Sequence, residues 1–506
     1  MDRVATIEQL AARRFDLLVI GGGIIGAGIA EAATAHGLNV ALVERGDFAG
    51  ATSSASSKLV HGGLRYLQMG DVRLVREAHQ ERRYLMSVVA PHLVERLPFL
   101  FPLYRGGPHR PWVVRTGVLL YSALARAKLN GRVSTKRALR LVPQLRTEGL
   151  HSSALYADAR TNDGRLTIAN VRGAADRNAV VLNYAEVTAV RDDGADVLVD
   201  GQTVRVAARL VVNATGPWLD KIRRLEDESA APSVRLSKGV HLIVDGGEGW
   251  SAAVTIPHDK VRVSFAIPWE GKLLLGTTDT LHEGEPEDGR VTDEDVRTIL
   301  EEAGEAVRDL GPVRASFWGL RVLPGGPGAT ANARRETVYT RGPSGMLSVA
   351  GGKLTTYRRI ALDALEQLGV RDLNRRPRPL PGATGLAQIP WPMELDPTTR
   401  GHLLHLYGSL APEVLTPALE DPSLLEPLVP GRPDLRAQEL YAREREWART
   451  DEDVLRRRTT AWLAGERLDV ELRARGDDSD QAGRTGRAQR IAGATGKPDP
   501  GEMRRV

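Results

Sequence analysis

A glycine motif near the N-terminus limits the fold of this chain more than any other feature. The apolar run 16–20 is followed directly by a G-x-G-x-x-G motif, formed by Gly21, Gly23 and Gly26. The first glycine permits a tight turn, the second lets a pyrophosphate approach the backbone, and the third lets a helix and a strand pack closely. Glu44 ends the next apolar run, where a carboxylate can bind both hydroxyls of a ribose. The N-terminal segment therefore predicts a βαβ unit that binds a dinucleotide.

Two later glycine-rich turns indicate which dinucleotide is bound. The string NATG at 213–216 ends one apolar run, and GGK at 351–353 follows another and starts a helix. A late strand that returns to the edge of the cofactor is typical of flavoproteins, in which FAD extends across a split domain. NAD-binding halves more often continue as consecutive βα units. The order of these turns favours FAD.

Composition excludes several other kinds of redox chemistry. The chain of 506 residues contains no cysteine, so disulfides, thiolate zinc sites and iron–sulfur ligation are ruled out. We expect no metal site, and electron transfer must then use an organic cofactor. The net charge is +5, but aromatic residues make up only 5% and are not interleaved with the basic ones. Nucleic-acid binding is therefore not expected, and anionic lipid or a phosphorylated substrate fits better.

The stretch 52–67, TSSASSKLVHGGLRYL, is unusually rich in hydroxyl, basic and glycine residues for a solvated linker. Together with DLLVIGGGIIGAGIA, NATGPW, WGLR and GGKLTTYR, this string resembles FAD-dependent glycerol-3-phosphate dehydrogenase. The match runs in order from residue 15 to about 365 and continues more weakly through EWARTDEDVLRRRT. The resemblance implies a flavoenzyme of the glycine-oxidase/glutathione-reductase-like superfamily. Such an enzyme oxidises sn-glycerol 3-phosphate to dihydroxyacetone phosphate by hydride transfer to FAD, passes the electrons to membrane quinone, and is expected to be a homodimer.

The expected fold class is α/β, with a Rossmann-like FAD-binding domain, a mixed-sheet substrate or cap domain and a C-terminal all-α domain. A Pro-, Gly- and Arg-rich connector near residue 377 marks the start of the helical part, and the Gly- and charge-rich end is expected to be disordered. The predicted ranges are 15–80, 150–225 and 315–370 for the FAD-binding domain, 81–149 and 230–314 for the cap, 371–388 for the linker, 389–473 for the helical domain and 474–506 for the tail.

The resemblance also assigns substrate residues by motif. These are Arg65 and Tyr66 in GGLRYL, His241 in KGVH, Arg321 in WGLR, Lys353 in GGKLTTY, and either Arg334 or Arg335 in ANARRET, with Arg335 preferred. Arg65, Arg335 and Lys353 would hold the phosphate, because fixed cations are needed for it. Arg321 would polarise the reacting oxygen beside the flavin.

His241 is the candidate general base, because an unperturbed histidine pKa near ~6.5 suits proton abstraction around neutrality. Alternatively, His241 is a structural residue of a strand. Arg321 could likewise be a surface residue that forms an ion pair.

The expected FAD site joins the glycine motif and Glu44 to the stretch 52–67 and to the later turns. Small hydroxyls after Glu44 would reach the pyrophosphate, Lys58 and His61 would lie near the flavin or phosphate end, and paired glycines would let the backbone pass close under the ring. The cofactor-binding set is Gly21, Gly23, Gly26, Glu44, Thr52, Ser53, Ser54, Ser57, Lys58, His61, Gly62, Gly63, Leu64, Val187, Ala214, Gly216, Gly319, Gly352, Lys353, Leu354 and Thr355.

The N-terminus has no apolar segment of signal-peptide length, and the longest apolar runs fall short of the ~20 residues that a spanning helix needs. The segment 110–132 combines Trp112 and several aliphatic residues with basic ones that include Arg115, Arg126, Lys128 and Arg132, the pattern of an interfacial helix. A cap helix that packs its apolar face on the protein is the alternative. The prediction is a cytoplasmic protein that can lie peripherally on the inner face of the cell membrane, with an anionic surface as partner.

Three other functions stay open on the sequence. An oxidase of the same fold would pass electrons from glycerol 3-phosphate to oxygen and produce hydrogen peroxide. An amino-acid or sarcosine-type oxidase would need a carboxylate-binding arginine but no cluster of cations. A flavin-bearing tRNA-modification protein would explain the positive charge, but an aromatic-rich basic surface is missing.

Overall fold

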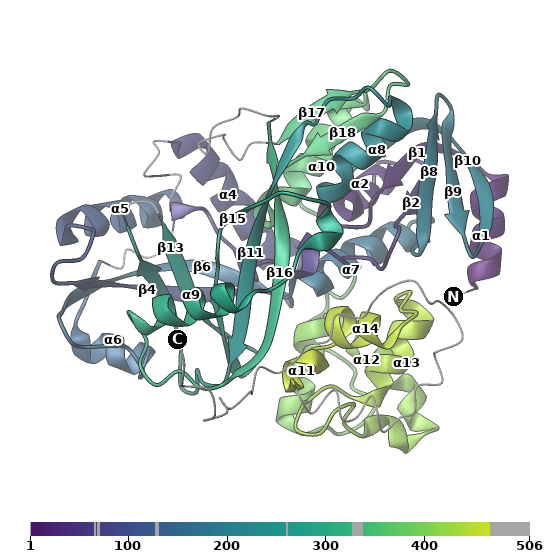
Figure 1. Cartoon of the computed structure of the whole chain (residues 1–506). Coiled ribbons are helices and arrows are strands. Elements are labelled where there is room, and N and C mark those ends of the chain that lie inside the picture. The colour runs from purple at the N-terminus through teal and green to yellow at the C-terminus, as the bar shows by residue number, and fades with distance from the viewer. Residues whose placement is uncertain are drawn as a thin grey trace, which may run out of the picture.

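The structure is a computed structural model of the chain and describes residues 2–64, 67, 71–126, 131–259, 262–325 and 337–465. Two sheets with their covering helices and a C-terminal group of helices make up the fold (Figure 1). The predicted fold class, α/β with a C-terminal all-α domain, is confirmed.

The first sheet carries the glycine motif. Its strands follow the order β17-β18-β10-β1-β2-β7, and β9 and β8 continue from β10. The central pairs β1–β2, β1–β10, β2–β7 and β10–β18 are parallel. The strands are β1 (Arg14–Ile20), β2 (Val40–Val43), β7 (Val180–Leu182), β8 (Ala185–Arg191), β9 (Gly194–Val199), β10 (Gln202–Asn213), β17 (Val338–Arg341) and β18 (Leu347–Ala350).

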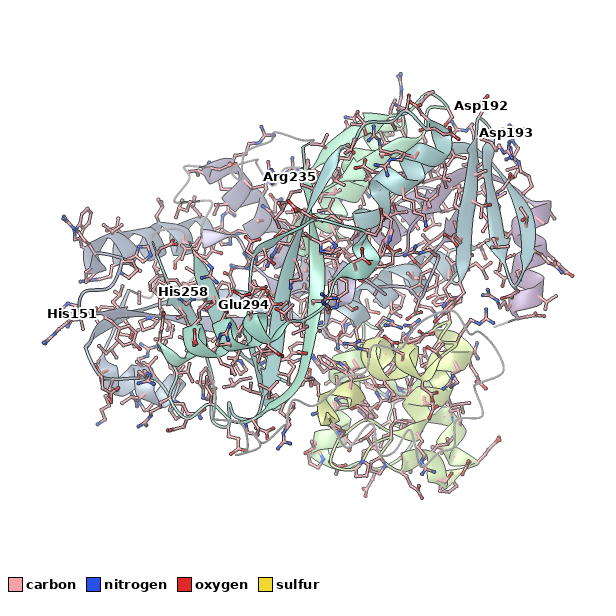
Figure 2. All side chains as sticks on the ribbon, viewed as in Figure 1. His151, Asp192, Asp193, Arg235, His258 and Glu294 are labelled. Carbon is pink, nitrogen blue, oxygen red and sulfur yellow. The ribbon has the colours of Figure 1, made fainter. Side chains whose placement is uncertain are left out.

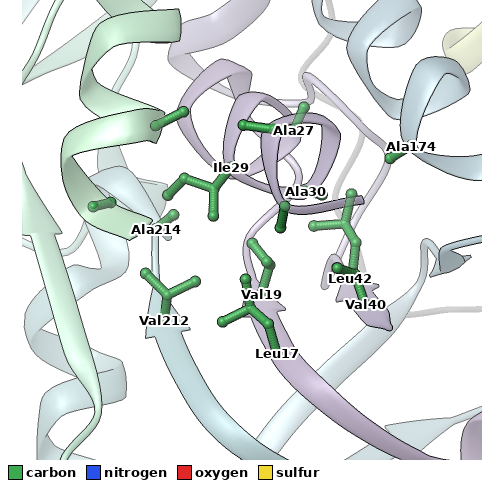
Figure 3. Packing of buried hydrophobic residues seen from close by; sticks show 14 of the residues in the cluster. Leu17, Val19, Ala27, Ile29, Ala30, Val40, Leu42, Ala174, Val212 and Ala214 are labelled. Carbon is green, nitrogen blue, oxygen red and sulfur yellow. The ribbon is translucent and has the colours of Figure 1, made fainter. Parts of the chain in front are cut away.

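Helices cover both faces of this sheet, so its central strands are apolar throughout. In β1, Leu17 and Val19 pack under α2 (Ile24–Thr34), while Leu18 faces the cluster on the opposite side (Figure 3). The first face is completed by α7 (Asp163–Ala175) and α10 (Tyr357–Gln367), and the second by α1 (Arg3–Ala12) and α8 (Leu219–Glu226). The β8–β9 hairpin extends this second face, and Asp192 and Asp193 lie at its exposed tip (Figure 2).

The second sheet is mostly antiparallel. Its order is β15-β11-β14-β13-β12-β4-β6-β3, with β16 paired to β11 and β5 paired to β6. The pair β12–β4 is parallel, so the sheet is mixed. The strands are β3 (Leu59–Val60), β4 (Val94–Tyr104), β5 (Arg132–Val133), β6 (Leu150–Thr161), β11 (Val234–Val244), β12 (Ala253–Pro257), β13 (Val263–Trp269), β14 (Lys272–Gly276), β15 (Thr280–His282) and β16 (Val313–Pro324); the helices beside them are α4 (Val72–Tyr84), α5 (Pro111–Leu124), α6 (Thr135–Leu141) and α9 (Asp293–Gly304).

Sheet membership differs from the predicted domain ranges at the short β3, which falls in the range 15–80 but pairs with β6, and at two long strands. Most of β16 falls in the range 315–370 and β6 in the range 150–225, both predicted for the FAD-binding domain, yet both strands pair within the second sheet. Both are long strands that pair with another long strand over most of their length. β16 pairs antiparallel with β11, and β6 pairs antiparallel with β4. A sequence pattern does not show such pairing, because the partners lie far apart in the chain.

The C-terminal helices have apolar clusters of their own, around Leu403 and around Val454. They are α11 (Pro397–Tyr407), α12 (Ala411–Leu415), α13 (Arg436–Arg445) and α14 (Asp451–Asp453), joined by short 3-10 and π turns. In Figure 1 these yellow-green helices lie below α7. Among the described residues, no helix has the length and apolar character needed to cross a membrane.

Candidate cofactor and substrate site

A cavity of about 640 Å³ opens where the carboxyl ends of β1, β2, β10 and β18 meet. Ligands of open parallel sheets bind at this edge. The cavity also reaches β16 of the second sheet. The predicted site residues that line it are Gly21, Gly23, Glu44, Thr52, Ser53, His61, Val187, Ala214, Gly216, Arg321, Gly352, Lys353, Leu354 and Thr355.

The glycine motif forms a tight cradle at the N-terminus of α2. Gly21 has φ +106°, and a Cβ on Gly26 would approach the Gly21 carbonyl oxygen to 1.9 Å, so neither position admits a side chain. Ser53 closes the cradle from the stretch 52–67, because its Oγ accepts the Ile24 N–H at 2.8 Å. Backbone N–H groups and the helix dipole at this place favour a phosphate. The cradle fits the pyrophosphate of FAD.

Glu44 lies in the same cavity at the end of β2. Its Oε2 accepts the Gly22 N–H at 2.7 Å and its Oε1 accepts the Gly46 N–H at 2.8 Å. Burial raises the pKa of Glu44, and the two backbone N–H groups act in the opposite direction. A carboxyl group fixed in this way beside the glycine cradle fits the ribose of a dinucleotide. The residues present therefore suit FAD.

The stretch 52–67 and the GGK turn meet through one threonine. Thr355 Oγ1 accepts the His61 N–H at 3.0 Å and donates to the His61 carbonyl oxygen at 3.1 Å. Gly352, at φ +104°, lets this turn lie close to α10, because a Cβ there would meet Ile360 Cδ1 at 2.8 Å. His61 and Lys353, 292 residues apart, both line the cavity in consequence.

Arg321 reaches the cavity from β16. Its guanidinium donates to Asp279 Oδ1 at 3.2 Å and to Thr277 Oγ1 at 3.0 Å, and it passes over the backbone of Gly239 on β11. A Cβ at position 239 would meet the Arg321 Nη2 atom at 2.6 Å. The guanidinium is thus held at a defined place by two strands and the turn that follows β14.

His241 lies on β11 and is 3% exposed. Its Nε2 is 2.8 Å from Ser57 Oγ, and its ring stacks on Phe317 at 4.9 Å between centroids. Burial, followed by the charges of Arg321 and Lys58, lowers the pKa of His241 well below its usual 6.5. The ring is therefore neutral at physiological pH, the form that accepts a proton. It lies behind the cavity wall and is not among the lining residues.

Lys58 does not reach the cavity. Its ammonium is buried against the Asp163 carboxylate and the Ser54 carbonyl oxygen, at the start of α7. Asp163 also accepts the N–H and the hydroxyl of Ser56, so this pair anchors the stretch 52–67 from behind. Other predicted site residues that do not line the cavity are Gly26, Ser54, Ser57, Gly62, Gly63, Leu64, Gly319 and His241.

Three predicted substrate residues cannot be placed. Arg65, Tyr66 and Arg335, and also the alternative Arg334, lie outside the described residues. The predicted tail 474–506 and the last residues of the predicted helical domain lie outside them as well.

Sequence reasoning missed several residues of the cavity wall. Arg45 stacks over Trp218 with 4.4 Å to the ring centroid, and both bind Glu287 Oε1, at 2.9 and 2.7 Å. Trp218 ends the NATGPW string, which offered a signal for it. The C-terminal residues Thr450, Glu452, Asp453 and Arg457 belong to the EWARTDEDVLRRRT string, but no local pattern in that string places them beside the glycine cradle.

Comparisons with known proteins agree with this geometry. The family model described as FAD dependent oxidoreductase matches residues 16–358, and the one described as C-terminal domain of alpha-glycerophosphate oxidase matches residues 374–471. Glycerol-3-phosphate dehydrogenase 2 of Mycobacterium tuberculosis is 36% identical over 504 residues, covering 94% of this chain and 85% of that protein.

Solved structures show the same likeness. The glycerol-3-phosphate dehydrogenase from Bacillus halodurans complexed with FAD matches with a TM-score of 0.74 and 31% identity, covering 93% of this chain and 91% of that chain. Glycine oxidase from Geobacillus kaustophilus matches with a TM-score of 0.54 and 23% identity over 73% of this chain and 99% of that chain, a likeness of fold.

Proposed function

This chain belongs to the FAD-dependent glycerol-3-phosphate dehydrogenase family, and on that premise we propose that it oxidises sn-glycerol 3-phosphate to dihydroxyacetone phosphate and passes the electrons to membrane quinone. The observation that carries the proposal is one cavity in which Glu44 and the glycine cradle lie with Arg321 and Lys353. Glu44 and the glycine cradle suit FAD, and the cationic side chains of Arg321 and Lys353 suit a phosphorylated alcohol.

The protein residues would divide the work as follows. Bound FAD supplies the hydride acceptor. Arg321 is oriented by Asp279 and Thr277, so its guanidinium can polarise the substrate oxygen without rearrangement. The Lys353 ammonium would supply positive charge to hold the substrate phosphate.

Neutral His241 would receive the hydroxyl proton. The Ser57 hydroxyl, with its Oγ 2.8 Å from Nε2, would hold the imidazole ring in position.

The identity of the substrate is tested by measuring flavin bleaching and dye reduction with each candidate substrate at a saturating concentration. Purified protein is mixed without oxygen with glycerol 3-phosphate, glycerol or glycine, first without an acceptor to follow bleaching of the flavin and then with dichlorophenol-indophenol to follow reduction of the dye. We expect only glycerol 3-phosphate to bleach the flavin and drive dye reduction. Bleaching by glycine alone would replace the proposal with an amino-acid oxidase.

The electron acceptor needs a separate measurement. With glycerol 3-phosphate and oxygen but no quinone, a dehydrogenase should form little hydrogen peroxide, and adding a soluble quinone analogue should raise turnover at least tenfold. Stoichiometric peroxide formation at the same rate as quinone reduction would favour the oxidase alternative.

Membrane contact is supported by the outer face of α5. Val114, Val118 and Tyr121 pack inward, while Trp112 and Leu120 are 63% and 48% exposed beside Val113 and Leu119. Arg110, Arg115 and Arg126 on or beside this helix are exposed. An apolar face bordered by arginine suits an anionic membrane surface. The inward face of α5 packs on the protein, and the exposed outer face is the one we propose for membrane contact.

Liposome flotation tests this face. The double variant Leu119→Gln/Leu120→Gln should lose binding to anionic vesicles, whereas Leu419→Gln, a 58% exposed leucine of the C-terminal helices, should bind as the unchanged protein does. Equal binding of the two variants would rule out α5 as the contact. Homodimerisation stays a prediction from the family and is checked by light scattering of the purified protein.

A further inference from the structure

The C-terminal helices form part of the wall of the cofactor cavity. Thr450, Glu452, Asp453 and Arg457 line the same cavity as Glu44. They come from α14 with its N-cap residue and from the π turn 454–458, more than 400 residues after Glu44 in the sequence. In Figure 1, α14 lies directly below α7, on the side of the C-terminal helices that faces the first sheet.

A buried charge network joins these helices to the loop after Glu44. Asp47 Oδ1 accepts from Arg458 Nη2 at 2.7 Å, and Asp47 Oδ2 accepts from Arg458 Nη1 and Arg457 Nε. Arg458 is 0% exposed and Asp47 is 4% exposed. Asn183 adds a hydrogen bond to Asp47 Oδ1 at 3.2 Å and another to the Trp447 carbonyl oxygen at 2.7 Å. Two arginines on one buried carboxylate fix the relative position of the two segments.

A second connection runs through Tyr184, which also lines the cavity. Its hydroxyl donates to the Asp453 carboxylate at 2.8 and 2.9 Å, and its N–H donates to the Gly46 carbonyl oxygen at 2.9 Å. Gly46 in turn donates to Glu44 Oε1 at 2.8 Å. A chain of hydrogen bonds thus leads from the C-terminal Asp453 to the carboxyl group that fits the ribose.

We propose that the C-terminal helical domain completes the FAD site at its adenosine end. Glu452 and Thr450 face the adenosine half of the cofactor, and the Asp47–Arg457–Arg458 network holds the loop of Glu44 in its binding position. The domain is then a cofactor-binding element and not only a helical appendage. The inference depends on FAD as the cofactor but not on the proposed substrate or electron acceptor.

Two neighbouring acidic residues of α14 provide a matched test. Glu452 lines the cavity and its side chain is 64% exposed, while Asp451 does not line it and is 50% exposed. Each takes part in an ion pair with an arginine. Glu452→Trp should raise the dissociation constant for FAD at least tenfold, because the indole enters the cavity. Asp451→Trp should change it less than twofold.

FAD binding is measured on apoprotein of the full chain by flavin fluorescence quenching, with the thermal unfolding temperature of each apoprotein measured in parallel. Arg457→Gln and Arg445→Gln form a second pair, since Arg457 is buried in the network and Arg445, on α13, is exposed and does not line the cavity. The first should weaken FAD binding at least tenfold and the second less than twofold.

Equal FAD dissociation constants within both pairs would overturn the proposal, even if Arg457→Gln lowered the unfolding temperature. That result would show that the domain is docked on the cofactor domain without taking part in binding. Activity with glycerol 3-phosphate is not used here, so a wrong substrate would leave the outcome unaffected.

Discussion

The Asp158 carboxylate accepts the backbone N–H of Gly62 at 3.2 Å. Asp158 itself is held by Arg82 from α4 and by the Tyr121 hydroxyl from α5, with 2.9 Å from that hydroxyl to each carboxylate oxygen. His79, on the same face of α4 as Arg82, lies directly behind Gly62. The loop that carries His61 to the cavity is therefore supported from the rear by the second sheet and its helices.

Close packing of Gly62 against His79 predicts strong coupling between the two positions. A Cβ at position 62 would approach His79 Cε1 to 2.4 Å, and the ring cannot yield easily because it also packs on Tyr121 at 4.4 Å between centroids. Gly62→Ala should cost about 1–3 kcal/mol of stability. In the double variant with His79→Ala, part of that cost should disappear, giving a coupling of at least about 0.5 kcal/mol. Denaturant unfolding of the four proteins measures it, and additive costs would contradict the packing.

Stability should fall in mild acid because of His79. Burial, followed by the charges of Arg82, Arg83 and His61, lowers the pKa of His79 to about 3. The unfolded chain binds a proton near pH ~6.5 that the folded chain binds only near 3, so stability decreases as pH falls between those values. One such histidine lowers the free energy of unfolding by about 1.4 kcal/mol per pH unit, or by about 2 kcal/mol between pH 6.5 and 5.

Unfolding at both pH values checks this expectation. His79→Leu should reduce the loss of stability between pH 6.5 and 5 but not abolish it, since burial also lowers the pKa of His92 to about 3. His151→Leu is the control, because His151 is exposed and projects from the edge of the molecule (Figure 2). An unchanged pH dependence in His79→Leu would show that His79 is not the cause.

The dependence of kcat/KM on pH should reflect the low pKa of His241. Because the pKa of His241 lies well below 6.5, the ring remains neutral and able to accept a proton as pH falls from 8 to 6. We therefore expect kcat/KM to stay level over that range. His241→Gln should lower kcat/KM by about 10²–10⁴-fold while FAD stays bound. A loss of less than threefold would leave His241 a structural residue stacked on Phe317, the alternative that the sequence left open.

The sequence predicted those parts of the fold and site that rest on local patterns. The glycine cradle and Glu44 lie within one βαβ unit, so spacing alone located them. Lys58 shows the limit of such reasoning. Its neighbours in the chain suggested the flavin, but its ammonium is buried against Asp163, which a separate strand and helix bring to it. The pairing of β6 and β16 with the second sheet and the place of Arg457 in the cavity wall likewise depend on contacts between distant segments.

Gly239 should be as necessary for turnover as Arg321, whose guanidinium passes over it. Gly239→Ala would place a Cβ 2.6 Å from Arg321 Nη2 and displace the guanidinium from Asp279 and Thr277. A shift of about 1 Å in a positioning group can lower the rate about 10²-fold, so kcat/KM for glycerol 3-phosphate should fall by about that factor. FAD content should be unchanged, because the glycine cradle is untouched. Gly401→Ala, with no atom within 4 Å of the added Cβ, is the matched control. If both variants turn over at the unchanged rate, the position of Arg321 over β11 has no part in the reaction.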